Sequence, residues 1–223
     1  MSVRKVFAIN ASRKTHNTAM MLKKALEGAE SEGAQTQLIN LHDFKVNGCK
    51  GCMACKMLKN VPPKSCLQKD ELSPILEKCV YDADSVLVGG SIYFWQPGGV
   101  FRSFSERLLY PYYIYGAPAG KSYYPRKDQK WGIIYTMGAS MSEIEDFTCN
   151  KKGEDSMDAL DLFYKKIIGN VEELKVYMTS IVKDFNGYEL DWLNRPEKKD
   201  YHDKIWGQNL EKAYQMGKRL AIK

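Results

Sequence analysis

The sequence has no long hydrophobic run. Its first apolar stretch, residues 6–9, is four residues long, which is too short for the core of a secretion signal or for a membrane-spanning helix. No stretch of low complexity divides the 223 residues, and this length suits one domain with a sizeable core. We therefore expect a single cytoplasmic domain over residues 1–223, with no membrane partner.

Familiar catalytic and nucleotide-binding motifs are also missing. The sequence lacks the spaced glycines of a dinucleotide fold, and its nearest approach to a Walker loop, residues 116–122, is one residue short. The three histidines are far apart, and no pair of carboxylates is placed for hydrolysis. These absences exclude the commonest hydrolytic arrangements, and they leave no side chain to assign as a catalytic acid or base.

The charge is modestly basic, with a formal net charge of +6. Nucleic-acid binding would explain such an excess, but the basic residues are scattered and no nucleic-acid-binding motif accompanies them. A solvated basic surface is the simpler interpretation, and it is compatible with small anionic ligands. We therefore expect no nucleic-acid partner.

Hydrophobic patterns alternate between strand and helix along the chain. The predicted strands cover residues 3–9, 35–41, 84–90, 131–137 and 175–182. The predicted helices lie around apolar positions at helical spacing in residues 19–29, 72–80, 100–108, 160–171 and 205–220. This alternation implies an α/β fold with a five-stranded parallel sheet and helices on both faces. Ligands of such sheets bind outside the carboxyl ends of the strands, so the loops there are the expected ligand sites.

The loop after the first predicted strand, residues 10–18, carries hydroxyls, an amide and two cations at the start of a helix. A helix start adds unpaired backbone N–H groups and a partial positive charge, and a terminal phosphate needs this combination. An ordinary helix cap, made by Thr15 or Asn17, explains the same residues. Taken alone, the loop leaves both interpretations open.

The loop after the third predicted strand, residues 89–99, contains four glycines and three consecutive aromatic residues. Glycine lets the backbone approach a flat ligand closely, and Tyr93, Phe94 and Trp95 can flank an aromatic ring. A glycine-rich turn beside the core is the alternative. We favour the flat ligand because the two loops follow the strand ends where a ligand is expected.

These loops resemble those of the flavodoxin-like NAD(P)H-dependent FMN reductases, a family that includes the iron–sulfur flavoproteins. Ser12, Asn17 and Thr18 keep their places in the family's phosphate loop, whereas Ala11 replaces its usual glycine. Residues 89–108 follow the family's flavin loop, with Ser91 where proline is common. The resemblance implies a flavodoxin-like fold that binds FMN. The residues expected around FMN are Ser12, Arg13, Lys14, Asn17, Thr18, Ser91, Ile92, Tyr93, Phe94, Trp95, Thr136, Met137 and Gly138.

The resemblance also implies an activity. The protein would be an FMN-dependent NAD(P)H oxidoreductase, with NADPH as the expected donor, although no segment resembles a site for its 2′-phosphate. The acceptor would be small: a quinone, a nitro- or azo-aromatic, or free flavin. The cofactor carries this chemistry, so no catalytic side chain is predicted. The alternatives are an iron–sulfur flavoprotein that transfers single electrons and a non-catalytic flavodoxin-like binding module.

Four of the six cysteines lie within eighteen residues: Cys49, Cys52, Cys55 and Cys66. In a cytoplasmic chain such a group indicates metal, cluster or redox chemistry rather than structural disulfides. The first three can face one [4Fe–4S] cubane, and Cys66 can complete it. The ten-residue gap before Cys66 is longer than in the cluster-binding relatives, so we favour free or redox-active thiols over a cluster or a zinc site. Cys79 is expected in the core, and Cys149 has no assigned role.

Residues 110–124 contain six tyrosines. Aromatic residues are enriched at protein interfaces, and the resemblance implies a flavin pocket completed across a subunit boundary. We therefore expect a homodimer or a higher homo-oligomer. A lid packed on its own domain is the alternative.

Overall fold

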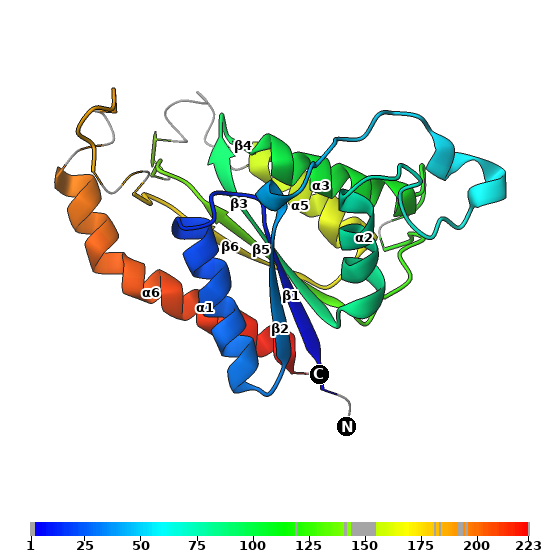
Figure 1. The fold of residues 1–223 in the computed structure, drawn as a ribbon, viewed down its shortest axis with the longest axis horizontal. Helices are drawn as coiled ribbons and strands as arrows, with labels where there is room; N and C mark the ends of the chain where they lie inside the picture. The colour runs from blue at the N-terminus through cyan, green and yellow to red at the C-terminus, as the bar shows by residue number, and fades with distance from the viewer. Residues whose placement is uncertain are drawn as a thin grey trace.

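The computed structural model describes residues 3–118, 120–140, 142–143, 155–180, 182, 184–190, 194 and 196–222. Its centre is a parallel sheet with the strand order β2-β1-β3-β5-β6 (Figure 1). The parallel strands are β1 (Lys5–Asn10), β2 (Gln35–Asn40), β3 (Ser85–Tyr93), β5 (Lys130–Thr136) and β6 (Val171–Val176). The predicted five-stranded parallel sheet is confirmed. A short antiparallel strand, β4 (Gln96–Pro97), adds to β3.

The central strands are apolar because both of their faces are covered. Every residue of β1 after Lys5 is buried, and so are the first six residues of β3. Strands covered on both faces have near-continuous hydrophobic runs, which is the pattern that predicts them from sequence. The outer strand β2 is only partly buried and alternates instead.

Helices cover both faces of the sheet (Figure 1). One face carries α1 (Asn17–Ser31) and α6 (Pro196–Ala221), and the other carries α2 (Leu72–Glu77), α3 (Gly99–Leu109) and α5 (Asp155–Ile167). A separate hydrophobic core lies under each layer. Among the helices that the structure describes, none has the length and apolar character needed to cross a membrane.

The helices α1 and α6 touch through their backbones. A Cβ atom added at Gly217 would overlap the carbonyl oxygen of Ala25, and one added at Gly28 would overlap that of Tyr214. Only glycine allows such an approach between helices. The close contact packs α1 and α6 into one layer on this face of the sheet.

The prediction for the last strand and the preceding helix is wrong in position. The apolar pattern places a helix over residues 160–171 and a strand over 175–182, but α5 ends at Ile167 and β6 begins at Val171. Gly169 adopts φ 108° and turns the chain, and the Trp131 N–H donates to the Asn170 carbonyl at 2.9 Å, which brings β6 beside β5. Because β6 lies at an edge and is mostly half-buried, it needs no continuous apolar run.

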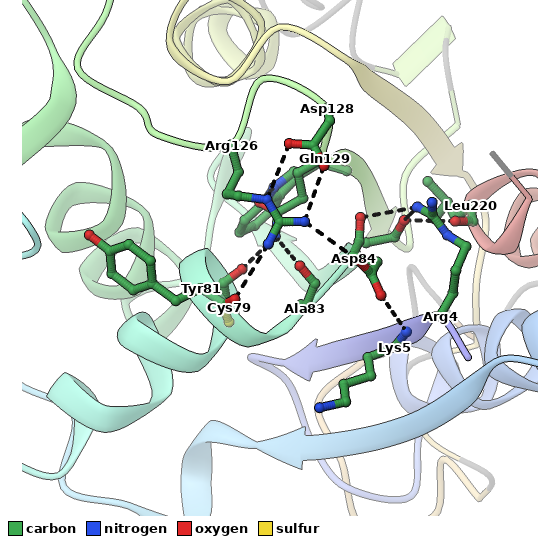
Figure 2. Close-up of polar contacts among 12 residues, drawn as sticks. Arg4, Lys5, Cys79, Tyr81, Ala83, Asp84, Arg126, Asp128, Gln129 and Leu220 are labelled. Carbon is green, nitrogen blue, oxygen red and sulfur yellow. Dashed lines mark hydrogen bonds and ion pairs between the residues drawn. The ribbon is translucent and has the colours of Figure 1, made fainter. Parts of the chain in front are cut away.

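Polar contacts join the amino-terminal ends of the strands, far from the predicted ligand site (Figure 2). Arg126 pairs with Asp128 at 3.1 Å and with Asp84 at 3.5 Å. The second carboxyl oxygen of Asp84 accepts the backbone N–H of Lys5 at 2.9 Å. These contacts join the start of β1 to the residue before β3 and stabilise the amino-terminal edge of the sheet. The predicted ligand loops lie at the opposite, carboxyl-terminal edge.

Gln129 is the buried polar centre of the same edge. Its Nε2 donates to the carbonyls of Cys79 at 2.7 Å and Ala83 at 2.8 Å, and its Oε1 accepts from Trp131 Nε1 at 2.8 Å and from the Tyr124 hydroxyl. It thereby satisfies carbonyls in and just after the π-helical turn Lys78–Asp82 that follows α2. Cys79 is fully buried here, which confirms its predicted place in the core.

Candidate functional site

The start of α1 is open to an anion. Within the described chain its N-cap is His16, which makes no side-chain cap hydrogen bond, and its first turn holds no acidic residue. Asn17 is the first residue inside α1 and not its N-cap, and its Nδ2 donates to the Ser180 carbonyl at 2.6 Å. The first N–H groups of a helix need acceptors, and the helix dipole favours a negative one. This geometry favours the phosphate interpretation over the plain helix cap.

Four hydroxyls meet at this helix start, three from the carboxyl ends of β1, β3 and β5 and one, that of Thr18, from the first turn of α1. Ser12 Oγ lies 2.7 Å from Ser91 Oγ, and Thr18 Oγ1 lies 2.7 Å from Thr136 Oγ1 and 3.4 Å from Ser91 Oγ. Ser12, Thr18 and Thr136 are buried. Hydroxyls both donate and accept hydrogen bonds, so the group can turn its donors toward a phosphate or a sugar chain. The sequence predicted all four residues for the site, and the fold brings them together.

Asn10, at the end of β1, holds this loop in place. Its Oδ1 accepts the backbone N–H of Ser12 at 3.1 Å, and its Nδ2 donates to Asn40 Oδ1 at 2.9 Å. The side chain is fully buried. Sequence reasoning gave Asn10 no separate role, although an amide at the end of an apolar strand is the signal that could have identified it.

A cavity of about 50 Å³ adjoins the cluster of four hydroxyls. It is lined by Ser12, Arg13, His16, Asn17, Ser91, Ile92, Tyr93, Thr136, Met137, Gly138 and Thr179. Lys14 is not in the lining and pairs with Asp43 instead. His16 and Thr179 were not predicted. Thr179, whose N–H donates to the Met137 carbonyl at 2.8 Å, was missed because the last strand was predicted too late in the chain.

Tyr93, Phe94 and Trp95 lie at the tip of the hairpin between β3 and β4 and do not form one wall. Tyr93 pairs with Gln96 across β3 and β4, and the two residues between them, Phe94 and Trp95, have φ angles of 50° and 60°. A two-residue turn with both residues left-handed usually contains asparagine or glycine. Bulky residues there are strained, and strain of this kind is concentrated at functional sites. The Phe94 side chain is 98% exposed, whereas Trp95 packs against the core.

The glycines of this loop have another role than the one expected. A Cβ atom at Gly89 would collide with Thr18 and Leu22 of α1, and one at Gly90 would collide with Phe101 of α3. These glycines therefore let the helices approach β3 closely. The expectation that they admit a flat ligand is corrected for Gly89 and Gly90, while Gly99 has open space beside it.

The cysteine loop projects beyond α2 and α3 as the cyan segment of Figure 1. All four predicted cysteines line one small cavity of about 20 Å³: Cys49, Cys52, Cys55 and Cys66. Burial raises the pKa of the Cys55 thiol. Among the described residues, no group of three potential metal ligands is arranged to hold an ion. Cys149 lies outside the described residues.

Arg107 of α3 anchors both ends of the cysteine loop. Its side chain is fully buried, and its Nη1 donates to Asp70 Oδ2 at 2.6 Å and to the Asn47 carbonyl at 3.1 Å. Nη2 donates to the Gln68 carbonyl at 3.0 Å. Burial lowers the pKa of Arg107, but Asp70 and Cys66 outweigh this effect, so the guanidinium stays charged beside the thiols.

Lys56 joins the cysteine loop to the tyrosine segment. Its Nζ donates to the carbonyls of Tyr110 at 2.5 Å, Pro111 at 3.2 Å and Tyr113 at 2.5 Å. Burial lowers the pKa of Lys56. These three hydrogen bonds hold the backbone of residues 110–113, whereas Tyr115 is 64% exposed.

Solved structures with the same fold place this arrangement in a class. An NAD(P)H:quinone oxidoreductase from Methanothermobacter marburgensis superposes with a TM-score of 0.61 at 13% identity, covering 100% of this chain and 99% of that one. An FMN-dependent NADH-azoreductase from Bacillus anthracis, in complex with FMN, gives 0.60 at 11% identity, covering 98% and 100%. With the observed strand order, these similarities define a flavodoxin-like fold.

The family follows from the sequence comparison. The family model for NADPH-dependent FMN reductases matches residues 4–143, so the chain belongs to that family. An iron-sulfur flavoprotein from Archaeoglobus fulgidus is 34% identical over 103 residues, which are 46% of this chain and 48% of that protein. Another from Methanocaldococcus jannaschii is 35% identical over 97 residues, 43% and 46% of the two chains. The chain thus matches these curated relatives over about half of their length.

Proposed function

We propose that residues 1–223 form one FMN-binding domain and that the protein is an FMN-dependent NAD(P)H oxidoreductase. This proposal rests on the cluster of four hydroxyls beside the start of α1, which come from Ser12, Thr18, Ser91 and Thr136. Hydroxyls and helix N–H groups at one point suit a terminal phosphate. Membership of the NADPH-dependent FMN reductase family supports FMN as the molecule whose phosphate binds here.

The chain's own residues would bind and orient the reactants. The start of α1 and the cluster of four hydroxyls would hold the FMN phosphate. Arg13 lines the cavity that adjoins this cluster. Backbone groups near Tyr93 and Gly138 would position the ring. Bound FMN would accept reducing equivalents from NAD(P)H, with NADPH expected, and pass them on. The quinone oxidoreductase and azoreductase among the similar folds support a small acceptor such as a quinone, a nitro- or azo-aromatic, or free flavin.

The binding test compares FMN with riboflavin, which lacks the phosphate. We expect tighter binding of FMN, and Thr18→Ala should weaken FMN binding by about 1.5–3 kcal/mol, the usual worth of a hydrogen bond to a charged group, without affecting riboflavin. Thr36→Ala, the same change on the partly buried strand β2, is the matched control. Fluorescence titration measures both affinities. Equal affinity for FMN and riboflavin would remove the phosphate assignment.

The activity test is anaerobic reduction. NADPH or NADH added to the FMN-loaded protein should bleach the flavin absorbance within minutes. If the flavin is bound but neither nucleotide reduces it, the non-catalytic binding module becomes the better proposal.

The second candidate function is one-electron transfer through a [4Fe–4S] cluster. It is favoured by the convergence of four cysteines on one cavity, and three curated relatives are iron-sulfur flavoproteins. As arranged, however, the cysteines do not fit a cluster, since a cavity of about 20 Å³ has room for about one water molecule. No step of the proposed reaction is therefore assigned to a cluster.

Metal analysis separates the two candidates. After anaerobic purification we expect no stoichiometric iron or acid-labile sulfide, because the four thiols are not arranged as a ligand set. Thiol titration before and after mild oxidation should then show the loss of a pair of thiols. About four irons and four sulfides per chain, lost in Cys52→Ser, would contradict this expectation and establish the second candidate.

We further propose a homodimer, or a higher homo-oligomer, formed through the exposed part of residues 110–124. Tyr112 and Tyr124 are buried in their own domain, but Tyr115 is 64% and Tyr123 36% exposed. Exposed tyrosines are frequent anchors of interfaces. Light scattering at micromolar concentration should report a dimer that Tyr115→Ser weakens and that Tyr188→Ser, an exposed tyrosine elsewhere, leaves intact. A wild-type monomer would overturn the proposal.

A further inference from the structure

A second and larger cavity, of about 480 Å³, adjoins the flavin-phosphate site. It lies between the start of α1, the loops after β5 and β6, and the first turns of α6. It shares His16, Asn17, Gly138 and Thr179 with the smaller cavity, so the two cavities are adjacent. We call the larger cavity the recess. Its volume is within the range of small-molecule pockets, about 300–1,000 Å³.

Most of its far wall lies outside the part of the chain matched by the family model. That model ends at residue 143, whereas the wall contains Lys198, Lys199, His202 and Trp206 of α6. This part of the recess is therefore built by the carboxyl-terminal segment that follows the matched residues.

Lys198 fixes the start of α6 against the flavin side of the recess. It is 7% exposed, and its Nζ pairs with Glu143 at 3.0 Å and donates to the Gly138 carbonyl at 3.2 Å. A buried lysine needs such partners. The contact joins α6 to the loop after β5 that lines the smaller cavity, so the two cavities keep a fixed relation.

The recess combines a flat surface with an exposed lysine. His202 stacks on Trp206 with ring centroids 4.9 Å apart and an angle of 28°. Lys199 is exposed within the lining, and His16 stands on the side shared with the phosphate loop. The acidic residues facing the same space are Asp184 and Asp203. Flat rings stack on purines, lysine attracts phosphate, and carboxylates accept hydrogen bonds from sugar hydroxyls.

We propose that this recess binds the adenylate half of a dinucleotide, meaning a purine with its phosphorylated ribose, while the other half lies at the flavin site. The proposal deepens the proposed function and rests on it for the second half of the ligand. A flavin dinucleotide would place its flavin phosphate in the smaller cavity and its adenylate in the adjoining recess, whereas NAD(P)H would place its adenylate in the recess while FMN keeps the smaller cavity. Two ligands have this chemistry: NAD(P)H and a flavin dinucleotide.

The first experiment titrates FMN-loaded protein with adenosine 2′,5′-bisphosphate by calorimetry. We expect saturable binding that Lys199→Met weakens roughly tenfold, the loss of one hydrogen bond to a charged group. His202→Gln should weaken it as well. Lys204→Met is the matched control, because Lys204 is exposed on the same helix but is not in the lining. No saturable binding, or an equal loss in Lys204→Met, would overturn the proposal.

The second experiment identifies the source of the adenylate. Competition between the bisphosphate and NADPH, with FMN retained, would assign the recess to the nicotinamide nucleotide. Tighter binding of FAD than of FMN to flavin-free protein, with only that difference lost in Lys199→Met, would assign it to the flavin. If neither of these two results is obtained, the proposal is contradicted. Binding of the bisphosphate does not require flavin reduction, so the recess can be established even if NADPH fails to bleach the flavin.

Discussion

Replacing Asp70 with asparagine is expected to lower the free energy of unfolding by about 3–5 kcal/mol. The Arg107 side chain is fully buried and meets Asp70 at 2.6 Å. Removing one partner of a buried pair leaves the other charge without compensation, which costs more than the pair itself contributes. The variant should also free the cysteine loop, because Arg107 holds both of its ends.

Denaturant unfolding at neutral pH measures this loss. The control is Asp200→Asn, the same change at an exposed position of α6. A loss below about 1 kcal/mol, the usual value of a surface ion pair, would show that the buried pair contributes no more than an exposed one. Thiol accessibility in the folded variant, measured by the rate of labelling, should rise if the loop is loosened.

The effect of Asp70 should also depend on pH. Burial alone would raise its pKa, but hydrogen bonds from Arg107, Gln68 and Asn47 outweigh burial and hold the pKa well below its ordinary value. A group with a lowered folded pKa stabilises above its unfolded pKa, about 3.9 for Asp, and this contribution is lost as pH falls further through the folded value. The gap between wild type and Asp70→Asn should therefore narrow below about pH 4.

Two glycines of α6 should respond in opposite directions to alanine. Gly217→Ala is expected to destabilise the protein by about 3 kcal/mol, because its Cβ would overlap the Ala25 carbonyl and force α1 and α6 apart. Gly207→Ala is the matched control in the same helix. No atom lies within 4 Å of its added Cβ, so better helix propensity should stabilise the protein by about 0.5–1 kcal/mol.

Thermal and denaturant unfolding of the two variants test the packing of the α1–α6 layer. Equal effects of the two substitutions would contradict the direct backbone contact. Because α1 begins at the phosphate loop, Gly217→Ala should also weaken FMN binding in the fraction that folds, whereas Gly207→Ala should leave it unchanged.

The positions of the ligand loops could be read from sequence because strand patterns are strong at the sheet centre. β1 and β3 are buried on both faces, and their apolar runs mark where each ends. Once the ends are known, a parallel sheet puts the following loops at one edge. Ser12, Thr18, Ser91 and Thr136 therefore belonged together before any contact was known. The position of β6 was predicted wrongly because an edge strand needs no continuous apolar run.

The amino-acid pattern was enough to predict the parallel α/β sheet, the hydroxyl-rich and glycine-rich loops at its carboxyl edge, and the family. The role of each side chain in those loops became known only from the three-dimensional packing. It turned Lys14 toward Asp43, used Gly89 and Gly90 for helix packing, and buried Arg107 between the ends of the cysteine loop. It also closed the recess beside α6. Local patterns specify helices and strands, because they depend on residues that are close together in the sequence. These contacts join residues that are far apart in the sequence, and the distances between them depend on how all the layers pack.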